Sequence, residues 1–152
     1  MAKKSVQWKK GRGKLGIMTP LIGTWKAETA LPGGYGKAQC TRTFTPILRG
    51  TCIQLHARWE FSKGIYEELA LFGFHDGKIS FWSFTSDGKR SQGVMTDGRD
   101  VHPEAIAFEA QMPAGLARMI YWPEEKEGFN WAVESKSKKG WNRFTHHHYT
   151  PV

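Results

Sequence analysis

The chain has 152 residues, of which 39% are hydrophobic and 24% charged, and this suits a single globular domain with its own core. Its net charge is +8, but the first 14 residues contain six basic and no acidic side chains, whereas the other 138 contain 16 basic and 14 acidic ones. The body of the protein is therefore almost neutral, which disfavours a domain that binds nucleic acid through a strongly basic surface. No run of 18 apolar residues occurs, so the sequence predicts no membrane-spanning helix.

The basic N-terminal segment predicts a flexible leader over residues 1–17, ahead of a single domain over residues 18–152. Such a leader is either a solvated extension or a segment that binds RNA or another anionic surface, and both interpretations stay open. Its basic residues are Lys3, Lys4, Lys9, Lys10, Arg12 and Lys14.

The segment Thr19-Pro20-Leu21-Ile22-Gly23 predicts a short helical turn. Thr19 is suited to cap it, because a threonine hydroxyl accepts a hydrogen bond from a free backbone N–H, and Pro20 suits the first helical position because its φ is already helical. We expect this turn to close one end of the fold, with the first strand starting at Thr24.

Glycine-centred turns divide the rest of the chain into segments rich in aromatic and β-branched residues. Neighbouring turns lie 10 to 17 residues apart, which leaves room for one strand between each pair. Successive hairpins of this kind predict an all-β, antiparallel up-and-down barrel of about ten strands, wide enough to hold a ligand. The turns are expected at Gly33-Gly34, Arg49-Gly50, Lys63-Gly64, Asp76-Gly77, Asp87-Gly88, Asp97-Gly98, Ala114-Gly115, Glu127-Gly128 and Lys139-Gly140.

The third predicted strand shows the clearest alternation between its two faces. His56 and Arg58 share the polar face. If that face lines the lumen, the two side chains would anchor a ligand carboxylate; if it faces water, they are ordinary surface residues. The apolar face consists of Ile53, Leu55, Ala57, Trp59 and Phe61.

Two later segments, residues 65–74 and 79–84, are apolar on both faces. The outer face of a barrel strand needs cover when it is apolar. Either a second copy of the protein packs here and forms a homodimer, or a few aromatic side chains stay exposed.

The chain contains two cysteines, Cys40 and Cys52. A hairpin at Arg49-Gly50 would place Cys52 opposite Ile47 and Cys40 near Trp59, so the two thiols would not face each other. We therefore predict that both are reduced and that the protein is cytoplasmic.

The motif Gly23-Thr24-Trp25, directly after a short helical turn, resembles the opening of the calycin superfamily, which includes the lipocalins and the fatty-acid-binding proteins. Over residues 18–150 the resemblance is closer to a bacterial lipocalin-like domain family that has no assigned activity. It implies a calycin-like barrel in which Trp25 packs at the closed end, and it implies no particular ligand. The features that carry it are Gly23-Thr24-Trp25, the Arg49-Gly50 hairpin, Tyr66-Glu67, Gly73-Phe74-His75-Asp76 and Trp82.

The run His146-His147-His148 resembles the haem-binding nitrobindins, which have a histidine on their last strand. The chain departs from their pattern, because Ala27 and Thr29 stand where they have further glycines. On a strand, His146 and His148 share one face and would bind a metal only with a third ligand, for which His56 is the candidate. Haem and metal stay alternatives to plain polar imidazoles, and the sequence commits to no cofactor.

Sequence motifs for catalysis are missing: the chain contains no nucleophile elbow and no glycine-rich phosphate loop, so the sequence does not indicate an enzyme. Glu67 and Glu68 are adjacent and point to opposite faces, which makes them a poor acid–base pair. We predict instead that the barrel binds a small, largely apolar ligand. The predicted lining is Trp25, Trp59, Trp82 and Trp131, with Glu67 or Arg58 as a polar anchor.

Overall fold

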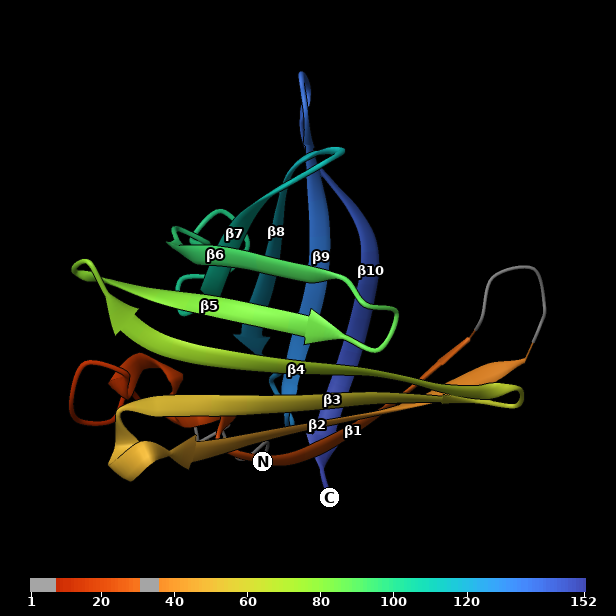
Figure 1. Ribbon diagram of the computed structural model, residues 1–152, viewed down its shortest axis with the longest axis horizontal. Helices are drawn as coiled ribbons and strands as arrows, with labels where there is room; N and C mark the ends of the chain where they lie inside the picture. Colours follow the sequence, from red (N-terminus) through yellow and green to blue (C-terminus); the bar gives the residue numbers. More distant parts are fainter. Residues whose placement is uncertain (1–7, 31–35) are drawn as a thin grey trace.

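The computed structural model describes residues 8–30 and 36–152, and in these residues ten antiparallel strands close into one barrel (Figure 1). Each strand pairs with the next along the chain and the last pairs with the first, which confirms the predicted all-β up-and-down barrel. The strands are β1 (Gly23–Ala30), β2 (Lys37–Ile47), β3 (Cys52–Phe61), β4 (Gly64–His75), β5 (Lys78–Thr85), β6 (Arg90–Thr96), β7 (Ile106–Met112), β8 (Gly115–Pro123), β9 (Phe129–Ser137) and β10 (Gly140–Pro151).

The connections between strands contain the predicted glycine turns, except that Gly33-Gly34 lies outside the described residues. Among these turns, Gly128, between β8 and β9, makes the closest approach to another strand, and its φ is +78°. A Cβ at this position would lie 1.9 Å from the carbonyl oxygen of Tyr149 in β10. The turn therefore needs both the left-handed backbone of a glycine and its missing side chain.

We expect Gly128→Ala to lower the free energy of unfolding by about 2–4 kcal/mol, because it adds a clash with a backbone carbonyl to the strain of a left-handed alanine. Gly88→Ala is the matched control, since Gly88 has a φ of +83° but a Cβ there meets nothing within 4 Å. Urea unfolding followed by tryptophan fluorescence measures both variants. Equal destabilisation would contradict the close contact between this turn and β10.

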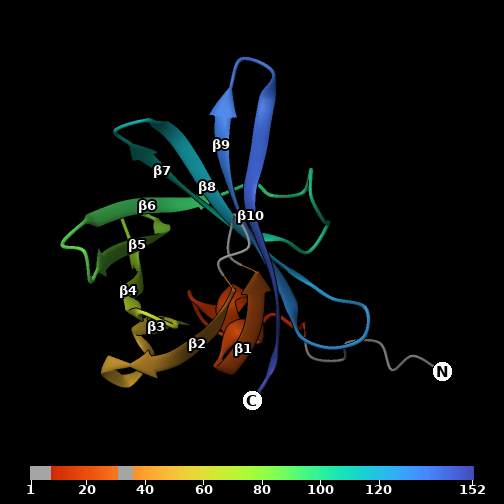
Figure 2. The same ribbon diagram turned by 90° about the vertical axis from the view of Figure 1, so that its right-hand side faces the viewer.

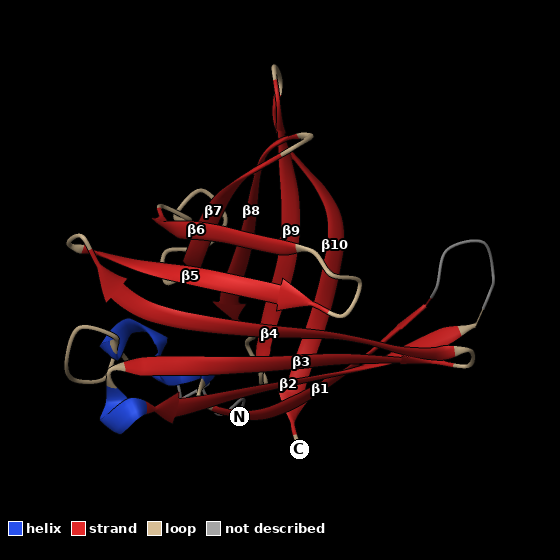
Figure 3. Ribbon diagram, viewed as in Figure 1, coloured by secondary structure: helices blue, strands red, loops and turns tan. Residues whose placement is uncertain are grey.

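The N-terminal helical turn is longer than predicted (Figure 3). It is a 3-10 helix, η1 (Gly16–Leu21), so Thr19 and Pro20 lie inside it and no side chain caps it. It starts earlier because Leu15 and Met18 are already buried in the core, which holds the chain in place before Thr19. As predicted, η1 closes one end of the barrel, since Met18 and Leu21 belong to the core cluster.

The described part of the leader, residues 8–17, lies against the barrel. The Nε1 of Trp8 donates to the backbone oxygen of Glu104 at 2.9 Å, and the Trp8 ring lies 6.4 Å from that of Phe129. The boundary predicted at residue 18 therefore falls within packed chain. Lys3 and Lys4 lie outside the described residues, and binding of RNA or an anionic surface by the leader stays a prediction. Within the described part of the leader, the exposed basic residues are Lys9, Lys10, Arg12 and Lys14.

Aromatic side chains fill the barrel at the end next to η1. The centroids of the Phe72 and Phe108 rings are 5.0 Å apart, and those of Phe44 and Tyr121 are 5.7 Å apart, in the edge-on geometry that aromatic pairs favour. Trp25 completes this end, because its Nε1 donates to the backbone oxygen of Leu21 at 2.8 Å. This is the place that the calycin resemblance implied for Trp25.

The outer faces of β4 and β5 carry apolar side chains, as the two-sided pattern predicted. Leu69 pairs with Phe84 across the ladder, and Leu71 pairs with Trp82. Leu69 is 43% exposed and Phe84 is 52% exposed. The second copy of the chain that would cover this face in a homodimer stays a prediction.

The two cysteines lie as the register predicted, with Cys40 opposite Trp59 and Cys52 opposite Ile47. Both thiols are free. The cytoplasmic location inferred from them stays a prediction. Within residues 8–30 and 36–152, no helix combines the length and the apolar character that crossing a bilayer requires.

Candidate functional site

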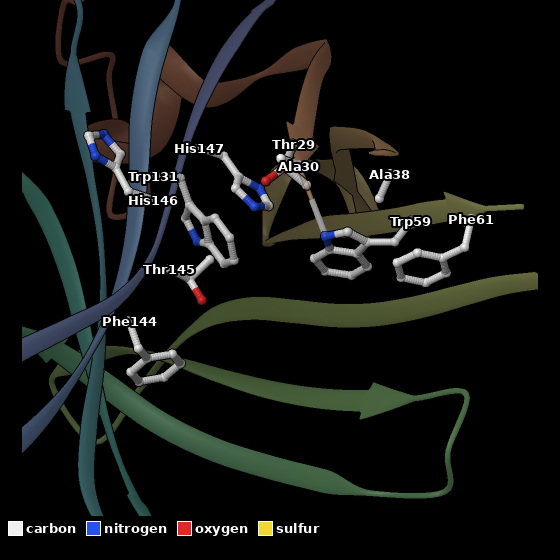
Figure 4. A pocket seen from close by; sticks show the side chains of 10 residues that line it. All are labelled: Thr29, Ala30, Ala38, Trp59, Phe61, Trp131, Phe144, Thr145, His146 and His147. Carbon is white, nitrogen blue, oxygen red and sulfur yellow. The ribbon is translucent and has the colours of Figure 1, made fainter. Parts of the chain in front are cut away.

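A pocket of about 470 Å³ opens at the end of the barrel opposite η1 (Figure 4). Its walls come from β1, β2 and β3 on one side and from β9 and β10 on the other. The lining residues are Thr29, Ala30, Ala38, Trp59, Phe61, Trp131, Phe144, Thr145, His146 and His147. The barrel is therefore packed at one end and hollow at the other.

The pocket exists because β1 and β10 stay together for only a short distance. Their ladder contains two pairs, Trp25 with Pro151 and Lys26 with Thr150. Beyond Lys26, β1 continues to Ala30 paired only with β2, while β10 turns away (Figure 2). The space between the two strands is the side on which the pocket opens.

A β-bulge in β10 determines which histidine of the C-terminal run faces the pocket. The register with β9 shifts between Arg143 and Thr145, so that Phe144 is the extra residue. A bulge of this kind re-aims the side chains that follow it. After it, His147 pairs with Trp131 and points into the barrel, while the ring of His146 lies on the other side of β10 (Figure 4).

Two indole rings form the inner walls of the pocket. The ring centroids of Trp59 and Trp131 are 6.5 Å apart, and the Trp131 ring lies 5.0 Å from that of His147. Ala30 and Ala38 contribute almost no side-chain volume, which leaves the space between the indoles and the rim open. Phe61 and Phe144 complete the rim with further aromatic surface.

Arg42 of β2 lies directly behind these indoles and is fully buried. Its guanidinium carbon is 4.4 Å from the ring centroid of Trp131 and 5.9 Å from that of Trp59. Its Nη2 donates to the hydroxyl of Tyr121 at 2.7 Å. Its Nε and Nη1 have no hydrogen-bond partner among the described residues, and neither does the buried Nε1 of Trp131.

Glu68 is the acidic residue closest to Arg42, with its Oε1 4.0 Å from Nη2. This distance is too long for a hydrogen bond, and Glu68 accepts instead from the hydroxyl of Ser83. Burial lowers the pKa of Arg42, but Tyr121, Tyr149 and Glu68 raise it more, so its pKa stands above the usual value. Arg42 is therefore a permanent positive charge inside the barrel.

The other titratable groups around Arg42 are held in their neutral forms. Burial raises the pKa of Cys40 to about 11 and raises the pKa of Tyr121 and of Tyr149 above the usual value for a phenol. Burial, together with the charge of Arg42, lowers the pKa of His147 to about 4. At neutral pH the pocket thus has a neutral aromatic wall with one cation behind it.

Of the predicted lining residues, the structure brings together only Trp59 and Trp131 in the pocket. Trp25 lies at the closed end. Trp82, which was predicted to line the lumen, lies on the outer face, where its ladder partner on β4 is Leu71. The sequence could not exclude this, because residues 79–84 are apolar on both faces.

The predicted polar anchors, Glu67 and Arg58, also lie outside the lumen. The Oε2 of Glu67 is 2.9 Å from Nε2 of His56, and Nε of Arg58 is 3.1 Å from Oε1 of Glu60. All four side chains are on the outer face because strand residues alternate, and Trp59 faces inward. The carboxylate that enters the barrel is that of Glu68, the neighbour of the predicted Glu67.

The metal site considered from sequence is not assembled. His56 of β3 contacts Glu67 of β4. By contrast, Nε2 of His146 is 3.0 Å from Oδ1 of Asn130, and Nε2 of His148 is 3.0 Å from the backbone oxygen of Glu127. In the described part of the chain, no three His, Cys, Asp or Glu residues are placed to hold a metal ion.

Arg42 is the residue of the candidate site that the sequence analysis missed, although the signal was present. Ala38, Cys40, Arg42 and Phe44 occupy alternate positions in β2, while glutamine and threonines occupy the positions between them. The first set is the buried face, so an arginine stands in an otherwise apolar row.

No family model and no curated protein matches the chain. The closed ten-stranded antiparallel barrel is compatible with a calycin-like fold.

We expect the stability of the protein to fall as the pH drops from about 6.5 toward 4. In that range unfolded His147 binds a proton, whereas folded His147, whose pKa is lowered to about 4, does not. The slope contributed is at most about 1.4 kcal/mol per pH unit. Urea unfolding at several pH values should show a smaller slope for His147→Gln than for the wild type. His75→Gln, at an exposed position, is the control, and equal slopes for wild type and His147→Gln would overturn the assignment.

Proposed function

We propose that this protein is a non-enzymatic binding protein of calycin type that holds a small, largely apolar molecule in the open-end pocket. The observation that carries the proposal is the pocket of about 470 Å³ that Trp59 and Trp131 help to line. This volume lies in the range of small-molecule sites, which are concave, mostly apolar and contain few polar groups.

The contrast between the two ends of the barrel supports this proposal. Next to η1, large inward side chains such as Phe44, Phe72 and Phe129 fill the interior. At the open end, the inward positions of β1 and β2 carry the small residues Thr29 and Ala38, which pair with each other and leave the interior unfilled. An apolar ligand placed there would remove the indole faces from water, which is the main source of affinity in such sites.

Two alternative functions raised by the sequence, haem binding and binding of RNA or an anionic surface, can each be tested directly. Haem bound by the histidine run would have to use His147, the histidine that points toward Trp59 from β10 (Figure 4). A Soret band that forms with haemin and is lost in His147→Gln would favour it. RNA or anionic-surface binding would have to be lost on deletion of residues 1–14, because the remainder of the chain is almost neutral.

We expect the neutral fluorophore phenylnaphthylamine to bind the wild type saturably, at one molecule per chain, and to quench tryptophan emission. Trp59→Leu should weaken this binding roughly 5- to 10-fold, the worth of one aromatic contact. Trp82→Leu is the matched control, because Trp82 faces outward from β5 and should leave the affinity unchanged.

Fluorescence titration of the three proteins measures these affinities. Absence of saturable binding to the wild type would count against a ligand-binding barrel. Equal weakening in both variants would place the bound probe somewhere other than this pocket.

A further inference from the structure

We propose that the ligand of this pocket is an anionic amphiphile, a molecule with an apolar body and one acidic group, and that Arg42 receives the acidic group. This inference rests on the proposed function. Its basis is the pair of unpartnered N–H donors that the fully buried Arg42 presents, Nε and Nη1.

The hydrogen bonding of Arg42 is incomplete for a buried cation. A guanidinium has five N–H donors, and in the described residues one hydrogen bond, to the Tyr121 hydroxyl, is made. Each buried donor left without an acceptor costs roughly 1–3 kcal/mol. An apolar side chain of similar size would avoid this cost, so barrel stability gives no reason for an arginine at this position.

A second residue beside the Arg42 guanidinium, Trp131, also has a buried N–H donor without an acceptor in the described part of the chain. The buried Nε1 of Trp131 has no acceptor in the described residues, and the Trp131 ring is the aromatic group closest to the Arg42 guanidinium, at 4.4 Å. The phenols of Tyr121 and Tyr149 and the thiol of Cys40 stay neutral around them. Oxygens of a carboxylate or sulfonate are acceptors only, and they match a cation and an indole N–H that both lack an acceptor.

The pocket lies next to the Arg42 guanidinium and the Trp131 indole. Trp59 and Trp131 line the pocket, and the guanidinium of Arg42 lies 5.9 Å and 4.4 Å from their ring centroids, so a ligand packed on the two indoles is separated from Arg42 by these rings alone. Trp131 is held by His147 and Tyr149, whereas Trp59 is only partly buried. The indole of Trp59 is therefore the ring that turns to admit the acidic group.

The carboxylate of Glu68 would compete with a bound ligand anion for the positive charge of Arg42. Its Oε1 lies 4.0 Å from Nη2 of Arg42, and a ligand anion at Arg42 would feel its negative charge. Removing that charge while keeping the shape should therefore strengthen the binding of an anion and leave the binding of a neutral molecule unchanged. This gives a gain-of-affinity variant, which a folding defect cannot imitate.

The test compares two probes with the same ring system, anilinonaphthalene sulfonate and the neutral phenylnaphthylamine, by fluorescence titration at neutral pH. We expect the wild type to bind the sulfonate at least 10-fold more tightly. Glu68→Gln should raise that preference a further 2- to 5-fold, and Arg42→Gln should abolish it. Arg42→Lys, which keeps the charge, should retain part of it.

The outcomes separate the two proposals. If neither probe binds the wild type saturably, the proposed function fails and the anion site fails with it. If both probes bind with similar affinity and Glu68→Gln changes neither, the pocket stands but the anion site is overturned. Near-UV circular dichroism checks that Arg42→Gln is folded, and if it is not, the wild-type preference and the Glu68→Gln variant still decide the question.

Discussion

The short ladder between β1 and β10 determines the shape of this barrel. Two residue pairs, Trp25 with Pro151 and Lys26 with Thr150, join the first strand to the last. They lie next to η1, where Trp25 is hydrogen-bonded to Leu21 and the aromatic core is dense. A longer ladder would have brought β10 against the end of β1 and closed the space in which the pocket lies. Closure at one end and opening at the other are consequences of the same pairing.

The charge of Arg42 connects the packed end of the barrel to the open one. Its guanidinium lies among the rings of Tyr121, Tyr149, Trp59 and Trp131, whose faces favour a cation. Those contacts lower the cost of burial, but they accept no N–H hydrogen bond of ordinary strength. The fold thus buries this cation while two of its N–H donors lack an acceptor in the described residues. Burial, together with the charge of Arg42, also lowers the pKa of His147 and keeps it neutral.

The sequence predicted the barrel well because its signals are local. Glycine turns at regular spacing specify hairpins, and the Arg49-Gly50 hairpin alone placed Cys40 opposite Trp59. The alternation in β3 grouped Trp59 with Ile53, Leu55, Ala57 and Phe61 on one face, which is the inner face in the structure. The start of η1 was missed because burial of Leu15 and Met18 is a tertiary effect that no capping rule contains.

The site was predicted only in part, because a period of two residues tells which side chains share a face and not which face is inside. In β5, where both faces are apolar, Trp82 was assigned to the lumen and lies outside it. At Glu67 and Glu68 the pair was recognised, and its inner member is Glu68. The bulge at Phe144, which decides the direction of His147, depends on the pairing of β10 with β9 and has no sequence signature of its own.

The position of Phe144 in the bulge also affects which substitutions the barrel can tolerate. It is the extra residue of the bulge, it is 65% exposed, and it stands at the rim of the pocket. A side chain at such a position belongs to neither regular face of its strand, so exchanging it disturbs no cross-strand neighbour. In the proposed ligand pocket, position 144 is thus a place where substitutions should change ligand selectivity while leaving the barrel intact.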